Sequence, residues 1–106
     1  MRGIGCCPGV VQGRVRVVRD PKGVVLERDE VLVALRTDPG WVLLFPAAAG
    51  LIVEHGSLLS HSAIVARELG LPAVVSVQGV TDWLRDGDVV ELDGSSGVVR
   101  RMSAAG

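Results

Sequence analysis

Three short apolar runs, separated by two segments of helical character, constrain the fold of this chain more than any other feature of its sequence. The runs cover residues 30–35, 50–54 and 72–77 and consist mainly of Val, Leu, Ile and Ala. Apolar runs of this length that do not alternate with polar residues are typical of strands buried on both faces. Because strands that alternate with helices build parallel sheets, the centre of the chain is predicted to form a parallel α/β unit.

Two helices are expected between these strands, and each has recognisable ends. The first starts at a group of residues suited to a cap and a first helical position, namely Thr37, Asp38 and Pro39. It is predicted to end around residues 48–50, after its apolar residues Trp41, Leu44 and Phe45. The second covers residues 60–69 and is closed by Gly70, with Pro72 just beyond it. A third, shorter helix is expected to end at Gly87.

Both ends of the chain have the patterns of antiparallel strands. Residues 14–17 alternate Arg with Val, as in a strand with one face in water, and residues 20–23 have the composition of a turn. Strands at residues 89–92 and 98–100 are predicted to form a closing hairpin. We therefore expect a single mixed α/β domain over residues 1–106, in which strands from both termini form a second β layer.

The composition argues against nucleic acid as a partner. A chain of 106 residues with 48% hydrophobic residues is long enough for one packed core and too apolar for disorder. It contains one Phe, two Trp and no Tyr, too few aromatic residues for a platform that stacks single-stranded bases. The net charge is −1 and the basic residues are scattered, so no surface suited to a phosphate backbone is predicted.

No membrane segment and no disulfide are predicted either. The N-terminus lacks the apolar core of a signal peptide, and the apolar stretch over residues 37–53 is interrupted by Asp38 and two prolines. We therefore expect a cytoplasmic protein without a membrane partner. Cys6 and Cys7 are adjacent, which disfavours a disulfide between them, and no neighbouring ligands complete a metal set. Both are interpreted as free thiols, buried or partly buried.

His61 is the main candidate for chemistry. With Ser57 or Ser60 as the cap, it lies in the first turn of the second predicted helix. Unpaired backbone N–H groups and the positive end of the helix dipole attract phosphate at such a position. The same field favours a neutral, nucleophilic imidazole. The preceding Gly56 and Ser57 are small enough to let a phosphate donor approach the backbone.

The segment also allows a non-catalytic histidine, a serine–histidine pair or a metal site. A histidine at a helix start is more often a surface or capping residue than a catalyst. A nucleophile–base pair of Ser60 with His61 is disfavoured, because neighbouring helical residues point about 100° apart. A metal site built from Glu54, His55 and His61 lacks i,i+4 spacing and a further ligand. We therefore predict no metal site.

The remaining residues of the segment have plainer roles. His55 is expected in a solvated turn, and Arg67 and Glu68 on the exposed face of the helix or in ion pairs. The helical spacing assigns Val65 and Leu69 to the core.

The stretch "GSLLSHSAIVARELGLPAVV", residues 56–75, closely resembles the phosphohistidine segment of the mobile domain of phosphoenolpyruvate-utilising enzymes. Pyruvate phosphate dikinase, phosphoenolpyruvate synthase, enzyme I and rifampicin phosphotransferase belong to this family. Gly56 takes the place of the family's first glycine, Ser57 stands where a second glycine is usual, and residues 59–61 match the reactive triplet. "CCPGVVQGRVRVV", "EVLVALRTDPGW" and "LRDGDVVELDGSSGVV" are similar to other parts of the same domain, so the resemblance covers nearly the whole chain.

The resemblance implies a compact, swivelling β/β/α domain in which His61 is phosphorylated and carries the phosphoryl group between two sites. The cradle for that group would be formed by Gly56, Ser57, Ser60 and Ser62. The donor site, with a nucleotide (or phosphoenolpyruvate), and the acceptor site, for pyruvate or another small molecule, would lie on partner domains or subunits. ATP and Mg²⁺ are expected on an ATP-grasp-type partner and not on this domain.

Two alternatives to a carrier remain open at this point. One is a docking or regulatory module without catalysis that keeps the surface of the mobile domain. The other is a protein that binds a small anion without transferring it. Since 106 residues hold only the mobile domain, the chain is expected to be either a stand-alone carrier or a domain of a longer enzyme.

Overall fold

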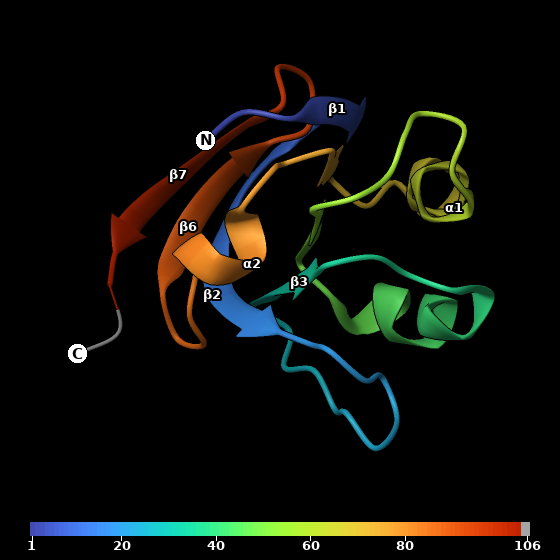
Figure 1. Ribbon diagram of the computed structural model, residues 1–106, viewed down its shortest axis with the longest axis horizontal. Coiled ribbons are helices and arrows are strands. Elements are labelled where there is room, and N and C mark those ends of the chain that lie inside the picture. The colour runs from blue at the N-terminus through green and yellow to red at the C-terminus, as the bar shows by residue number, and fades with distance from the viewer. Residues whose placement is uncertain (105–106) are drawn as a thin grey trace.

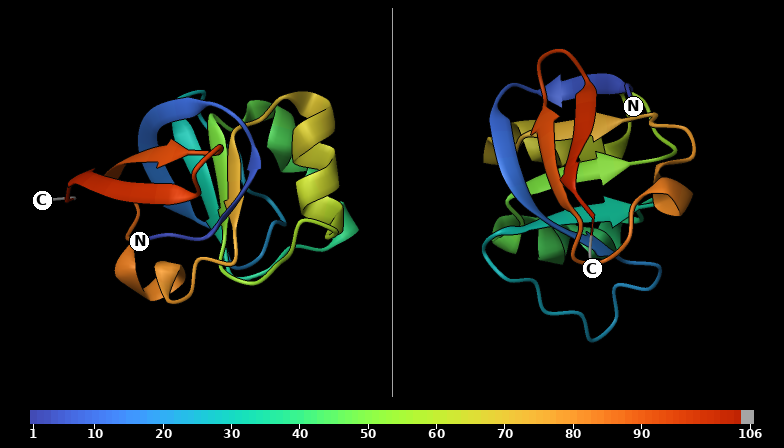
Figure 2. Two further views of the ribbon diagram at one scale, coloured as in Figure 1. Left: turned by 90° about the horizontal axis from the view of Figure 1, so that it is seen from above. Right: turned by 90° about the vertical axis from the view of Figure 1, so that its left-hand side faces the viewer.

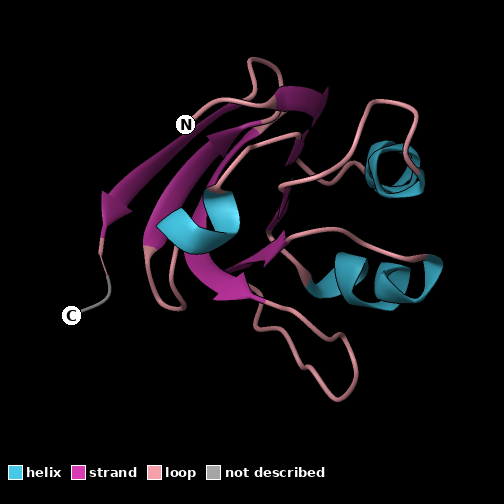
Figure 3. Cartoon of the chain, viewed as in Figure 1, coloured by secondary structure: helices cyan, strands magenta, loops and turns pink. Residues whose placement is uncertain are grey.

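The structure is a computed structural model that describes residues 1–104, and strands and helices follow one another along the chain as shown in Figures 1 and 3. The strands are β1 (Ile4–Cys7), β2 (Val10–Val17), β3 (Glu30–Ala34), β4 (Gly50–Val53), β5 (Ala73–Val75), β6 (Val89–Asp93) and β7 (Val98–Ser103). The helices are the 3₁₀-helix η1 (Pro39–Ala47) and the α-helices α1 (His61–Leu69) and α2 (Val80–Trp83).

All seven strands belong to one mixed sheet with the order β1-β5-β4-β3-β2-β6-β7. Strands β2 to β5 pair in parallel with their neighbours. At the two ends of the sheet the pairs β1–β5, β2–β6 and β6–β7 are antiparallel. The predicted mixed α/β fold with a parallel centre and antiparallel terminal strands is therefore confirmed.

The predicted second β layer is confirmed: side chains of β6 and β7 pack on those of β3, β4 and β5, although all these strands belong to one continuous sheet. Strand β2 pairs with β3 on one side and with β6 on the other, so the ladder continues unbroken into the hairpin. The accumulated twist curls this sheet until β6 and β7 face its centre (Figure 2). Residues 1–3 then connect the edges: the Gly3 N–H donates to the Gly97 carbonyl, and the Val99 N–H to the Met1 carbonyl, each at 2.8 Å.

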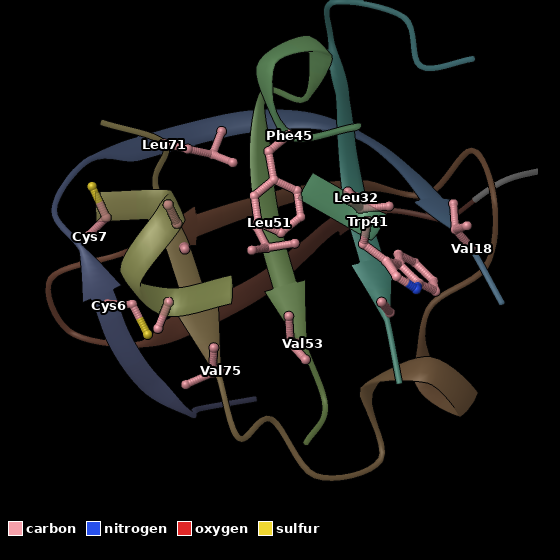
Figure 4. Close-up of a cluster of buried hydrophobic side chains, with 14 of the residues drawn as sticks. Cys6, Cys7, Val18, Leu32, Trp41, Phe45, Leu51, Val53, Leu71 and Val75 are labelled. Atoms are coloured by element: carbon pink, nitrogen blue, oxygen red, sulfur yellow. The ribbon is translucent and has the colours of Figure 1, made fainter. Parts of the chain in front are cut away.

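The central strands are buried on both faces, as their apolar runs predicted. In β3, the side chains of Leu32 and Ala34 belong to the core under the helices, while Val31 and Val33 belong to the core inside the curl. Strands β4 and β5 alternate in the same way. Figure 4 shows the first of these cores, where Phe45 lies over Leu51.

Cys6 and Cys7 lie in the core under the helices and are free thiols, as predicted. Figure 4 places both beside α1. Burial raises the pKa of the Cys6 thiol, and the positive charge of Arg67 opposes this shift. Both cysteines therefore serve as small apolar residues of the core.

Helix α1 packs on the sheet through small residues. Ser62, Ala63 and Ala66 are its buried residues, and Val65 is partly buried. The assignment of Leu69 to the core was wrong, because its side chain is 49% exposed. The chain reverses at Gly70, which has a φ of 69°, and Leu71 is buried just beyond the turn in place of Leu69.

The other two helices depart from the predictions in type or length. The first helix is a 3₁₀-helix, and although Asp38 is its N-cap residue, its side chain makes no capping hydrogen bond. Pro46 supplies no N–H to the last turn. Helix α2 ends at Trp83 and not at Gly87, since residues from Leu84 onward return to an extended and then a turn conformation.

Candidate functional site

His61 is the first residue of α1, and its side chain is exposed. Ser60 is the N-cap, and its Oγ accepts a hydrogen bond from the Ala63 N–H at 3.4 Å. The same Oγ donates to the Ser57 carbonyl at 2.6 Å and lies 3.4 Å from the Oγ of Ser62. The predicted position of the histidine in the first helical turn is confirmed, with Ser60 and not Ser57 as the cap.

The loop before His61 is braced from both sides. Within it, the Ser57 Oγ accepts from the Leu59 N–H at 3.2 Å. From the helix, the Arg67 guanidinium donates to the Leu58 carbonyl at 2.9 Å. Arg67 is exposed, as predicted, but its hydrogen bond holds the loop in front of the histidine, a role that the sequence did not indicate.

A shallow hollow of about 400 Å³ opens beside the imidazole, here called the His61 hollow. Its lining residues are Arg36, Thr37, His55, Gly56, Ser60, His61 and Ser62. Four of the five residues predicted to carry or cradle phosphate therefore meet there. Ser57 does not line it, and its hydroxyl is used within the loop.

Arg36, Thr37 and His55 are the members of the His61 hollow that the sequence reasoning did not include. Parallel strands β3 and β4 are neighbours, so the residues after them meet at the same edge of the sheet. The ladder continues past both strands, with the Glu54 N–H donating to the Ala34 carbonyl at 2.9 Å and the His55 N–H to the Leu35 carbonyl at 2.8 Å. This rule for adjacent parallel strands was the signal that could have identified them.

Glu54 does not line the His61 hollow, although its Oε2 lies 4.0 Å from the Nε2 of His55, which does. The Oε1 of Glu54 accepts hydrogen bonds from the Thr81 hydroxyl at 2.6 Å and from the Thr81 N–H at 3.0 Å, in the first turn of α2. These bonds, mainly that from the hydroxyl, hold the pKa of Glu54 below its usual range, with a smaller contribution from His55. Glu54 thus fixes the end of β4 to α2, and its negative charge is stabilised there by the hydrogen bonds from Thr81.

Replacing Glu54 by glutamine is expected to destabilise the protein by about 1 kcal/mol at pH 7, because a charged acceptor roughly doubles the strength of the Thr81 bonds. The lowered pKa means that this stabilisation is complete above the unfolded-state value of about 4.3 and is lost as the pH falls through the folded-state value. The free energies of unfolding of E54Q and the wild type, measured in urea, should therefore converge as the pH falls below the folded-state pKa of Glu54. E68Q, at an exposed position of α1, is the control and should match the wild type at neutral and at acidic pH. A pH-independent loss in E54Q would contradict the assignment.

The geometry suits an exposed nucleophile beside an anion site. The Ser60 hydroxyl donates to the Ser57 carbonyl, so the pairing of Ser60 with His61 as nucleophile and base finds no support. Across residues 1–104, no group of three or more His, Cys, Asp or Glu side chains is placed to hold a metal ion. The side chain of His61 instead stands free at the N-terminal end of a nine-residue helix, where negative charge is stabilised.

No helix within the described part of the chain is both long enough and apolar enough to cross a membrane.

Comparisons of the sequence with known proteins identify the family. The model of the family described as "PEP-utilising enzyme, mobile domain" matches residues 26–97, which include every residue of the His61 hollow. The chain is 44% identical to rifampicin phosphotransferase of Streptomyces sviceus over 101 residues, covering 95% of this chain and 12% of that protein. It is also 44% identical to phosphoenolpyruvate synthase of Aeropyrum pernix, covering 93% of this chain and 12% of that protein.

A solved structure supports the same relationship. The solution structure of an Enzyme I protein superposes with a TM-score of 0.64 at 30% identity, covering 78% of this chain and 34% of that one. The chain thus spans only about an eighth of the length of the curated relatives it matches.

Proposed function

The chain belongs to the family of PEP-utilising enzyme mobile domains, and on this premise we propose that it is a phosphoryl carrier whose His61 is transiently phosphorylated. His61 would take the phosphoryl group from a nucleotide or phosphoenolpyruvate site and pass it to an acceptor site. Both sites would lie on partner domains or subunits, or elsewhere in a longer chain, in the cytoplasm. The chain would then be one component of a phosphotransferase.

The observation that carries this proposal is the exposed imidazole at the start of α1, facing a hollow whose described lining contains no carboxylate. In the loading step, a lone pair of the neutral imidazole attacks phosphorus, and the bond from phosphorus to the donor's leaving oxygen breaks. The imidazole N–H proton is released as the N–P bond forms. In the delivery step, an acceptor oxygen attacks the same phosphorus, the N–P bond breaks and the imidazole takes up a proton, which regenerates His61.

The surroundings of His61 supply binding and orientation for this chemistry. Positive potential at the start of α1 stabilises the charge that the phosphoryl group adds. Gly56, Ser60 and Ser62 form the wall on which that group would rest. ATP and Mg²⁺ are proposed to bind to an ATP-grasp-type partner, because a 106-residue mobile domain spans 12% of the relatives that carry out a complete reaction.

The test is the intact mass of the chain after incubation with ATP, Mg²⁺ and a clarified extract of its source cells. The mass is measured at neutral to alkaline pH, since the N–P bond of phosphohistidine is labile in acid. Gain of one phosphoryl group, lost on brief acid treatment and mapped to His61, is the expected result. If neither the extract nor phosphoramidate modifies His61, the carrier proposal is overturned and a docking module without catalysis becomes the better account.

A further inference from the structure

We propose that the guanidinium of Arg36 binds the phosphoryl group during its transfer to and from His61. This inference rests on the proposed function and names a residue of the same site whose charge matches that group. It concerns the chain's own contribution to binding and not the identity of the donor or acceptor.

The sheet holds Arg36 at the edge from which the loop of His61 departs. Arg36 lies two residues beyond β3, and the Leu35 carbonyl accepts the His55 N–H at 2.8 Å. This bond fixes the backbone of Arg36 beside the start of the loop that leads to His61. The side chains of Arg36 and His61 consequently line one hollow.

Among the described residues that line the His61 hollow, Arg36 is the one whose side chain is positively charged at any physiological pH. No carboxylate belongs to the described lining of this hollow; the nearby Glu54 is bound at α2 by Thr81, and its Oε2 lies 4.0 Å from the Nε2 of His55. Arg36 itself is exposed and makes no side-chain hydrogen bond or ion pair with any residue in the range 1–104. A guanidinium without a side-chain partner that lines the same hollow as His61 is suited to bind two phosphoryl oxygens at once.

A second hollow, here called the Arg19 hollow, adjoins the first through Arg36. Asp20, Asp38 and Arg19 also line it. Neither aspartate forms an ion pair with Arg36, and the Asp20 Oδ1 accepts from the Lys22 N–H at 3.0 Å. Arg19 resembles Arg36 in exposure and in lacking a side-chain partner within the described residues, but it does not reach the His61 hollow. It is therefore a matched control.

Potassium phosphoramidate is the probe, because it phosphorylates histidine without a partner protein. A nitrogen lone pair of His61 attacks phosphorus, an N–P bond to the imidazole forms and the N–P bond of phosphoramidate breaks. Ammonia leaves as ammonium with the proton that the imidazole releases, so atoms and charge balance. The rate at His61 is the gain of intact mass in each variant minus the gain when His61 is replaced by alanine.

We expect R36Q to slow phosphorylation of His61 by about tenfold or more, since it removes a charge-assisted contact to the developing phosphoryl charge. The rate for R36K should lie between those of the wild type and R36Q, because lysine keeps the positive charge and lacks the planar pair of N–H donors of the guanidinium. R19Q should match the wild type. In phosphorylated R36Q, the pKa of the phosphoryl group followed by ³¹P NMR should be higher than in the wild type, a change that a purely structural role would not produce.

The outcomes separate this inference from the proposed function. If His61 is phosphorylated at equal rates in the wild type, R36Q and R19Q, the role of Arg36 is overturned, and the proposed carrier function is unaffected. Equal slowing in R36Q and R19Q also overturns it, because a general charge effect would then suffice. If His61 is not modified in any variant, by phosphoramidate or by the source-cell extract, the carrier proposal fails and the role of Arg36 fails with it.

Discussion

The variant H61A gains no phosphoryl group from ATP, Mg²⁺ and source-cell extract under conditions in which H55A is modified like the wild type. This is the expected result because the two histidines of the chain line the same hollow, but only His61 lies in the first turn of α1. Loss of the nucleophile removes the covalent intermediate itself, so the rate should fall by about a thousandfold or more. Intact mass and a quenched time course measure it.

H55A is the matched control for this experiment, since it removes an exposed imidazole from the same hollow and leaves the helix start unchanged. Both variants should keep the melting temperature of the wild type, because both side chains are exposed. If H61A is phosphorylated and H55A is not, the phosphoryl group is carried by His55, and the proposal is contradicted.

Gly94→Ala is expected to have the largest effect on folding. Gly94 follows β6, where the hairpin packs on β1, and a Cβ added to it would lie 1.7 Å from the Cys7 carbonyl oxygen. The atoms that this Cβ would meet, in Cys7 and Ala73, belong to the backbone, so no side chain can move aside and the hairpin must separate from β1. Because overpacking that a core can absorb already costs 1–3 kcal/mol, we expect a loss of more than about 3 kcal/mol. This corresponds to a fall of more than about 12 °C in melting temperature, measured by circular dichroism.

Gly40→Ala is the control for this prediction. Gly40 lies in η1, no atom approaches within 4 Å of its added Cβ, and it has no left-handed φ. The substitution should leave stability unchanged or increase it by up to about 1 kcal/mol, since alanine restricts the unfolded chain. A melting temperature of G94A close to that of G40A would show that the hairpin adapts, and would contradict the tight approach of Gly94 to Cys7.

Much of the local structure could be predicted from the sequence. The three apolar runs indicated β3, β4 and β5, and their lack of alternation indicated burial on both faces, which the two cores confirm. Ser60 and Gly70 marked the ends of α1 within one residue of where the structure has them. These features are encoded by nearest neighbours: caps, turn residues and the period of apolar side chains.

Predictions that depended on distant parts of the chain were less accurate. The helical spacing assigned Leu69 to the buried face of α1, but its side chain is 49% exposed. Spacing within a helix contains no information on how far the sheet beneath that helix extends. Likewise, the first helix was expected from its cap and its proline, whereas the structure has a 3₁₀-helix that contains Pro46 and buries Trp41 and Phe45.

The sequence by itself determined the order of strands and helices from β2 onward, the placement of His61 at a helix start and the family of the chain. Only the tertiary structure decided that the sheet is continuous and curled, with residues 1–3 connecting its edges. It also decided that Arg36, Thr37 and His55 join His61 in one hollow. The physical reason is that caps and apolar periods act over a few residues, whereas strand pairing brings together segments some twenty residues or more apart, through hydrogen bonds that carry no local sequence signal.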